Sequence, residues 1–104
     1  MKVYNTQAEV EKDIVNNILT VEGDVRFTMP YLKIDASIVI KAGNIKAGDI
    51  EAGNIKARDI KAWDISFYGV CWSYFSFKCK SVVGRREKSK YFCLDKEIEI
   101  IKEL

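Results

Sequence analysis

Histidine is absent from this chain of 104 residues, and proline occurs once. The missing imidazole removes the usual general base of enzymes and the commonest metal ligand in proteins. The chain also has no P-loop, no dinucleotide-binding fingerprint and no nucleophile elbow. These absences predict a protein that is not an enzyme and that needs no metal or cofactor.

Cysteine is scarce and widely spaced, at Cys71, Cys79 and Cys93. No two of these residues form a C-x-x-C pair, so a zinc site is disfavoured. An odd number of thiols cannot pair completely within one chain, which favours a reducing compartment. No apolar run approaches the roughly 18 residues of a membrane span, and no signal peptide opens the chain. We therefore expect a cytoplasmic protein without membrane contact, in which the thiols are structural or incidental.

The chain also has no large excess of charge of either sign, because its formal net charge is only +2. Residues 65–104 carry eight basic and five acidic side chains, which is a mild excess. The balance argues against an acidic mimic of DNA, and it does not reach the basic excess of a dedicated DNA-binding protein.

A five-residue unit is repeated five times between Ile40 and Ile65. In an α-helix, isoleucines five apart would encircle the axis and leave no apolar stripe. In one continuous strand they would point alternately to opposite faces. Both conflicts disappear if each unit is a short strand, Ile-x-Ala, followed by a corner of Gly with Asn or Asp. The repeat therefore predicts a narrow parallel β-helix with Ile and Ala inside and Lys or Glu outside, and it leaves the number of sides and the handedness open.

The segment before the repeat predicts a helical cap. Thr6 and Glu9 form a capping box, and Val10 and Ile14 follow at helical spacing. We expect residues 6–19 to cover the first coil, with an interaction arm as the alternative.

The remaining segments complete a mainly β, single domain over residues 1–104. Residues 21–77 are expected to form the solenoid, and residues 78–104 a basic loop and a β-hairpin cap, with the hairpin at 91–101. Cys71 is expected to face outward. After Ile65 the expected inward residues are Phe67, Val70, Trp72, Phe75 and Phe77.

The Ala, Asn/Asp and Ile positions of residues 40–77 resemble the pentapeptide-repeat family, whose coils have four sides of five residues. The phrases Val21-Glu-Gly-Asp-Val25 and Lys46-Ala-Gly-Asp-Ile50 are similar to the β-helical polymers called bactofilins. The repeats, together with the tail motifs beginning at Cys79 and Phe92, are similar to short uncharacterised proteins of bacteriophages and other mobile elements. These resemblances carry no catalytic motif.

Two groups of residues are candidate binding sites. The corner position of Gly43 is taken by Arg58 and Trp63 in later units, and exposed Trp beside Arg is the composition of a binding hot spot. The alternative is that Trp63 packs over the next coil. The second group combines basic residues with aromatic residues that could stack on nucleic acid, and its alternative is a solvated loop over an aromatic plug. It comprises Lys78, Lys80, Arg85, Arg86, Lys88 and Lys90, with Tyr68, Tyr74 and Tyr91 nearby.

The sequence thus predicts a non-enzymatic binding protein of phage or mobile-element type in the cytoplasm of a bacterial host. Its expected partner is a host protein complex for defence or nucleic-acid processing, which it would inhibit stoichiometrically as an anti-CRISPR or anti-restriction protein. A rigid solenoid suits this role because little entropy is lost on binding. Nucleic acid and a homodimer remain open as partners. The alternative function is a self-assembling scaffold like a bactofilin, which would need an open, apolar terminal coil.

Overall fold

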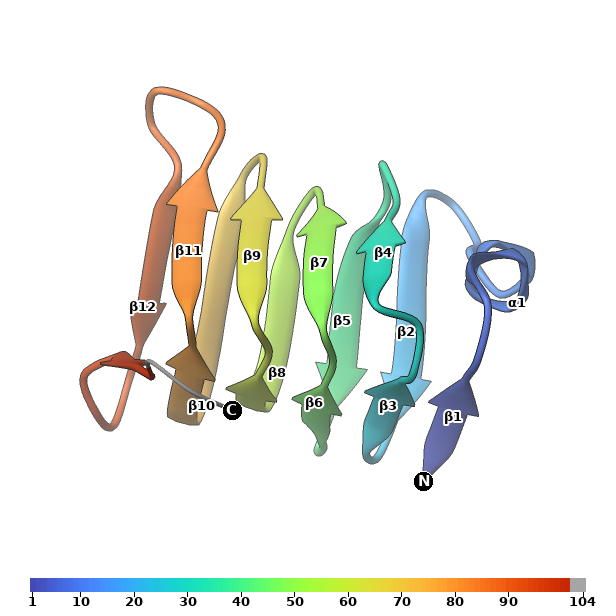
Figure 1. Ribbon diagram of the computed structural model, residues 1–104, viewed down its shortest axis with the longest axis horizontal. Coiled ribbons are helices and arrows are strands. Elements are labelled where there is room, and N and C mark those ends of the chain that lie inside the picture. The colour runs from blue at the N-terminus through green and yellow to red at the C-terminus, as the bar shows by residue number, and fades with distance from the viewer. Residues whose placement is uncertain (102–104) are drawn as a thin grey trace.

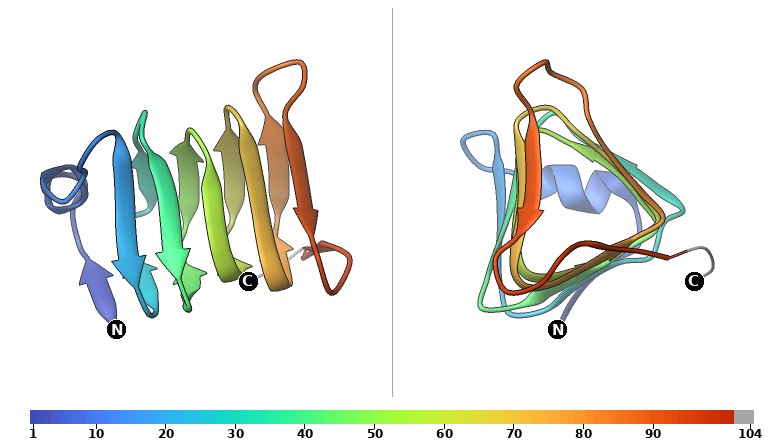
Figure 2. Two further views of the ribbon diagram at one scale, coloured as in Figure 1. Left: turned by 180° about the vertical axis from the view of Figure 1, so that it is seen from behind. Right: turned by 90° about the vertical axis from the view of Figure 1, so that its left-hand side faces the viewer.

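The chain winds into a parallel β-solenoid of about five coils with a triangular cross-section (Figures 1 and 2). The structure is a computed structural model that describes residues 1–101. The mainly β solenoid expected from the five-residue repeat is confirmed. No helix within these residues is long and apolar enough to cross a membrane.

Each coil after the first contributes a strand, or half of a long strand, to each of three sides, which follow one another along the chain. Side I consists of β1 (Lys2–Tyr4), β3 (Val25–Phe27), β6 (Asn44–Lys46), the second halves of β8 (Ile55–Lys61) and β10 (Val70–Cys79), and β13 (Glu99–Ile100). Side II consists of β4 (Tyr31–Lys33), β7 (Asp49–Ala52), β9 (Asp64–Phe67) and β11 (Ser81–Gly84). Side III consists of β2 (Ile18–Glu22), β5 (Ser37–Lys41), the first halves of β8 and β10, and β12 (Lys90–Cys93).

Three five-residue units make one regular coil. Ile45 lies opposite Ile60, and Ile50 lies opposite Ile65, in neighbouring coils. The four-sided coil implied by the pentapeptide-repeat resemblance is therefore wrong. Fifteen residues per coil leave room for three strand-and-corner units, so the cross-section is a triangle.

The inward side chains of the repeat form the core. Ile50 and Ile55 are 1% and 0% exposed, as expected. At the outward position of successive units, Lys46 is exposed, whereas Glu51 and Lys56 are partly covered by contacts with neighbouring coils. The solenoid is stabilised by columns of apolar side chains that repeat from coil to coil.

Asn and Asp at the corners link neighbouring coils, because a side-chain oxygen accepts a hydrogen bond from a backbone N–H of the next coil. The donor–acceptor pairs are Asn44 N to Asp24 Oδ1 (3.0 Å), Asp64 N to Asp49 Oδ1 (3.1 Å) and Val70 N to Asn54 Oδ1 (2.8 Å). Asp59 and Asp64 link coils differently, because they accept hydrogen bonds from the hydroxyl groups of Ser76 (2.8 Å) and Ser81 (2.7 Å). These links give most of the repeated Asn and Asp residues a structural role.

The alternation of side chains changes after Phe67, because the next corner contains one residue more than the equivalent corner at Gly53. Cys71 therefore lies opposite Ile55 and faces inward with 0% exposure. Shifting a strand by one residue moves every side chain to the other face. The inward placement of Val70, Trp72 and Phe75 and the outward placement of Cys71 are thus wrong, whereas Phe67 and Phe77 are buried as expected.

A short helix covers the first coil. α1 (Gln7–Lys12) takes the place of side II there and crosses the end of the triangle (Figure 2). Thr6 Oγ1 accepts a hydrogen bond from Glu9 N at 3.2 Å, so the expected capping box is present. The helix ends earlier than expected because the chain turns at Asn16 and Asn17, where φ is positive, and enters β2.

The expected C-terminal hairpin is absent from the described residues. β12 and β13 each pair in parallel with β10, where a hairpin would pair them with one another. They continue sides III and I as a last coil, because residues 94–98 form one more corner. Within residues 1–101, nothing lies over this last coil as α1 lies over the first (Figure 1).

Candidate binding site

The three sides carry different outward chemistry, because a coil of three units places residues of one kind in a column on one side. The column on side I contains Arg26, Lys46, Lys61 and Lys78. The column on side II contains Lys33, Glu51, Ser66 and Val83. The column on side III contains Val39, Lys56, Trp72 and Phe92. Sequence reasoning missed this sorting because it left the number of sides open.

Side I presents a cationic row. Its four basic residues lie on adjacent strands, which are about 4.8 Å apart in a sheet. Lys78 forms an ion pair with Glu99 at 3.9 Å, and within residues 1–101 the other three form none. Like charges placed opposite one another destabilise a sheet, so the row is suited to an anionic partner.

The row borders a depression of about 380 Å³ on side I. Its polar lining residues are Asp24, Asn44, Lys46, Asp59, Lys61, Ser76 and Lys78. The side-chain oxygen of Asn44 is buried and has no hydrogen-bond partner among the described residues. Within that part of the chain, no group of His, Cys, Asp and Glu could hold a metal ion.

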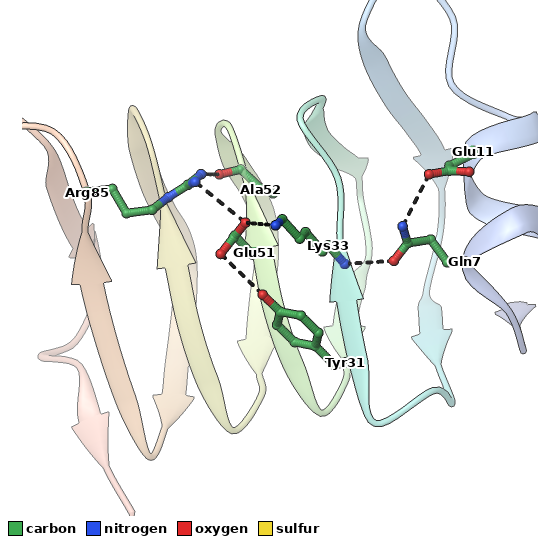
Figure 3. Close-up of polar contacts among 7 residues, drawn as sticks. All are labelled: Gln7, Glu11, Tyr31, Lys33, Glu51, Ala52 and Arg85. Atoms are coloured by element: carbon green, nitrogen blue, oxygen red, sulfur yellow. Dashed lines mark hydrogen bonds and ion pairs between the residues drawn. The ribbon is translucent and has the colours of Figure 1, made fainter.

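On side II, the Glu51 carboxylate links residues of three coils through a hydrogen bond and two ion pairs (Figure 3). One carboxylate oxygen accepts a hydrogen bond from the Tyr31 hydroxyl at 3.2 Å, and the other lies 3.8 Å from Lys33 Nζ and 3.7 Å from Arg85 Nη1. Arg85 Nη2 also donates to the Ala52 carbonyl at 2.7 Å. Arg85, a predicted binding residue, therefore links coils of the solenoid.

Arg58 and Trp63 do not form the expected joint hot spot. Arg58 lies at the start of the side I segment of β8 and Trp63 lies after its end, so they occupy two different corners of the triangle. Arg58 is 3.9 Å from the carboxylate of Asp59. Trp63 is 39% exposed, and Lys80 of the next coil places its Nζ 5.6 Å from the ring centre. Trp63 thus packs partly against the next coil.

The predicted basic group is spread around the molecule. Lys78 lies on side I, and Lys80 lies at the corner between sides I and II. Around the corner between sides II and III, the guanidinium carbons of Arg85 and Arg86 lie 6.0 and 5.4 Å from the centre of the Tyr68 ring. Lys88 and Lys90 belong to this same corner, which we call the basic corner (residues 85–90).

An aromatic cluster, which we call the aromatic surface (Trp72, Tyr74, Phe75 and Phe92), extends from side III to its corner with side I. Trp72 stacks on Phe92 with ring centres 5.6 Å apart and meets Tyr74 edge-on at 4.8 Å. Phe75, Tyr74 and Phe92 are 50%, 39% and 38% exposed. Lys56 Nζ lies 5.1 Å from the Trp72 ring centre.

Only Tyr74 of this surface was among the predicted binding residues. The sequence pattern places Trp72 and Phe75 in the core, because it continues the earlier alternation of side chains past Phe67. The signal was present in the sequence as three residues between Phe67 and Cys71, where the regular units have two between Ala and Ile. Tyr91, in contrast, faces inward and meets Phe67 edge-on at 6.1 Å.

The three thiols differ in environment. Cys71 and Cys79 are buried, and Cys93 is partly exposed. Burial raises the pKa of Cys71, and burial with the nearby charge of Asp64 raises the pKa of Cys79 to about 11. The two buried thiols are therefore protonated and unreactive near neutral pH.

We expect a thiol reagent such as DTNB at pH 8 to modify Cys93 quickly and Cys71 and Cys79 slowly, because the reactive species is an accessible thiolate. Absorbance of the released thiolate would show one fast equivalent in the folded protein and all three thiols in denaturant. Cys93→Ser should remove the fast phase. A fast phase from three thiols in the folded protein would contradict the inward placement of Cys71 and Cys79.

The fold and its surfaces define a short, three-sided parallel β-solenoid with one cationic, one ion-paired and one aromatic side. Comparison with known proteins found no matching family model, no matching curated protein and no matching solved structure. The likenesses to pentapeptide-repeat proteins, bactofilins and phage proteins therefore remain likenesses of short motifs.

Proposed function

We propose that this chain is a non-enzymatic binding protein that docks a protein partner on the aromatic surface. The observation that carries the proposal is one contiguous aromatic cluster, in which Tyr74, Phe75 and Phe92 are exposed and Trp72 is partly exposed. Exposed aromatic patches mark interaction sites, and Trp and Tyr concentrate binding energy. β10, which carries three of the four residues, is hydrogen-bonded to β8 on one side and to β12 on the other. The surface is therefore ordered before the partner arrives, and little entropy is lost on binding.

The partner in this proposal is a bacterial defence or nucleic-acid-processing complex, and binding inhibits it stoichiometrically, as an anti-CRISPR or anti-restriction protein does. Support comes from the motif likeness to phage proteins and from the absence of histidine and of catalytic motifs. The preformed aromatic surface is the kind of contact that such an inhibitor requires.

Nucleic acid is a second candidate partner. The cationic row on side I and the basic corner favour it, because phosphates are bound by rows of Lys and Arg. A bactofilin-like filament is disfavoured, because open-ended growth needs two open ends and α1 covers one of them (Figure 2).

A pull-down from bacterial lysate at low and high salt, followed by titration of the captured partner, tests the proposal. Phe75→Ser is expected to weaken binding by about 1–2 kcal/mol or more, because it removes an exposed anchor. Val83→Ser is the matched control, since Val83 is an equally exposed apolar residue on side II. Capture of a host complex that is insensitive to Phe75→Ser would contradict the aromatic surface as the site.

The same experiment distinguishes nucleic acid from protein. The double change Lys46→Gln with Lys61→Gln removes the centre of the cationic row and leaves the aromatic surface intact. If nucleic acid is the partner, this variant loses affinity and the affinity of the wild-type protein falls steeply with salt. If a protein is the partner on side III, both effects are small.

A further inference from the structure

The two ends of the solenoid differ in how their cores are covered. At the first coil, the inward residues Tyr4 and Leu19 are 3% and 0% exposed beside α1. At the last coil, the inward residues Tyr91 and Ile100 remain 48% and 56% exposed. Within residues 1–101, the last coil therefore presents apolar side chains at an end that no other segment covers.

The strands of the last coil also have free edges. β11, β12 and β13 each pair with a single neighbour among residues 1–101. Lys90 N at the start of β12 and Leu94 N just after its end donate to carbonyl groups of the preceding coil. Because N–H groups alternate in direction along a strand, those of Tyr91 and Cys93 point to the free edge. An unpaired edge of this kind is a template for pairing with another chain.

β12 joins two corners of opposite charge, which lie at its two ends (Figure 1). The basic corner, residues 85–90, carries four basic side chains and one acidic side chain. Residues 94–99, which we call the acidic corner, carry three acidic side chains and one basic side chain. Arg85 and Glu99 are already paired within the chain, with Glu51 and Lys78. The remaining charges face solvent.

We propose that two copies of this chain associate through their last coils, with β12 pairing antiparallel to β12 of the second copy about a two-fold axis. Antiparallel pairing places the start of one strand opposite the end of the other. The basic corner of each copy then meets the acidic corner of the other, twice in one interface. Side III continues across the dimer as one sheet, and α1 at both outer ends stops further growth.

The size of the end predicts a reversible dimer. The solenoid measures 33 Å along its long axis, so its end is at most 29 × 24 Å across (Figure 1). A contact of this extent lies among interfaces that bury less than about 1,200 Å² in total, which are typically weak or transient. Opposite charges around the edge make the association sensitive to salt. The proposal goes beyond the proposed function, since it concerns the purified chain alone.

Sedimentation velocity of the purified protein, from micromolar to millimolar concentration, tests the dimer. The wild-type chain is expected to shift from the 11.9 kDa monomer to a species of twice that mass, and added salt should oppose the shift. Arg86→Glu with Lys88→Glu makes both corners acidic, and Asp95→Lys with Glu97→Lys makes both basic. Each double variant alone should associate at least tenfold more weakly.

An equimolar mixture of the two double variants should restore the dimer, because every acidic corner then meets a basic one. Lys12→Glu with Lys41→Glu is the matched control, since it changes the same charge far from the last coil and should leave the dimer intact. Circular dichroism checks that each variant is folded. If a variant does not fold, the salt series on the wild-type chain still tests the dimer, because added salt should weaken the association.

Cys93→Pro tests the strand edge itself. It removes an N–H at the free edge and leaves the hydrogen bonds of β12 to β10, so the expected result is a folded chain with at least tenfold weaker association. A wild-type monomer at every concentration would overturn the proposal. Growth beyond a dimer, or a dimer that ignores the charge reversals, would overturn the antiparallel arrangement. Each of these results leaves the pull-down on the aromatic surface to be judged separately.

Discussion

Ile50→Ala is expected to lower the free energy of unfolding by about 2–5 kcal/mol, as other large-to-small changes in cores do. Ile50 is 1% exposed and lies between Leu32 and Ile65 in the column of side II. Its removal leaves a cavity that the hydrogen-bonded strands on either side cannot close. Urea denaturation followed by circular dichroism would measure the change.

Lys46→Gln is the matched control for this prediction. Lys46 lies in the same repeat, one unit earlier, but points to solvent, so its replacement should change stability by no more than about 0.5 kcal/mol. Equal effects of the two substitutions would contradict the assignment of inward and outward positions.

The regular part of the fold could be predicted because period five is incompatible with both a surface helix and a continuous strand. That argument fixed the inward place of Ile50 and Ile55, and the capping box at Thr6 and Glu9 fixed the start of α1. The number of sides could not be predicted, since a unit of strand and corner is compatible with either three or four sides. It depends on how far each corner turns the chain, and that is a property of backbone geometry.

The C-terminal part could not be predicted for a different reason. One additional residue between Phe67 and Cys71 inverted the alternation of the following strand, and sequence reasoning carried the earlier register through it. A two-strand pattern at residues 91–101 fits a hairpin and fits two successive sides of a coil equally well. Only pairing with β10 distinguishes them, and that pairing is long-range.

The prediction of the candidate site was right about which residues are exposed at corners, and wrong about which residues lie together. Residues that are exposed at corners were identified, but the triangular section distributes Arg58, Trp63 and Lys80 over different corners. The aromatic surface was missed because Trp72 and Phe75 were assigned to the core. The functional proposal now rests on the arrangement of side chains on each side of the solenoid, which depends on the three-unit coil.

Glycine is common at corners because it tolerates positive φ, but the corner glycine Gly43 has a different reason. Among the glycines, positive φ is found at Gly23. The φ angle of Gly43 is not positive, so its backbone conformation does not require glycine. A Cβ built on Gly43 would overlap the carbonyl group of Gly23 and lie 2.7 Å from Asp24 N. The glycine is required because two coils touch backbone to backbone at this corner, where Gly23 N also donates to Lys41 O at 2.8 Å.

Gly43→Ala should therefore destabilise the protein by about 3 kcal/mol, because forcing an extra methyl group against backbone atoms shifts the chain in two coils at once. Gly53→Ala is the matched control. Its Cβ would lie 3.2 Å from the Asp35 carbonyl oxygen, and alanine also restricts the unfolded chain, so the net change should be within about 1 kcal/mol. Thermal and urea unfolding of the two variants measure the difference. If Gly43→Ala were as stable as Gly53→Ala, the close contact between the coils at Gly23 would be refuted, and with it the stacking of the second coil on the third.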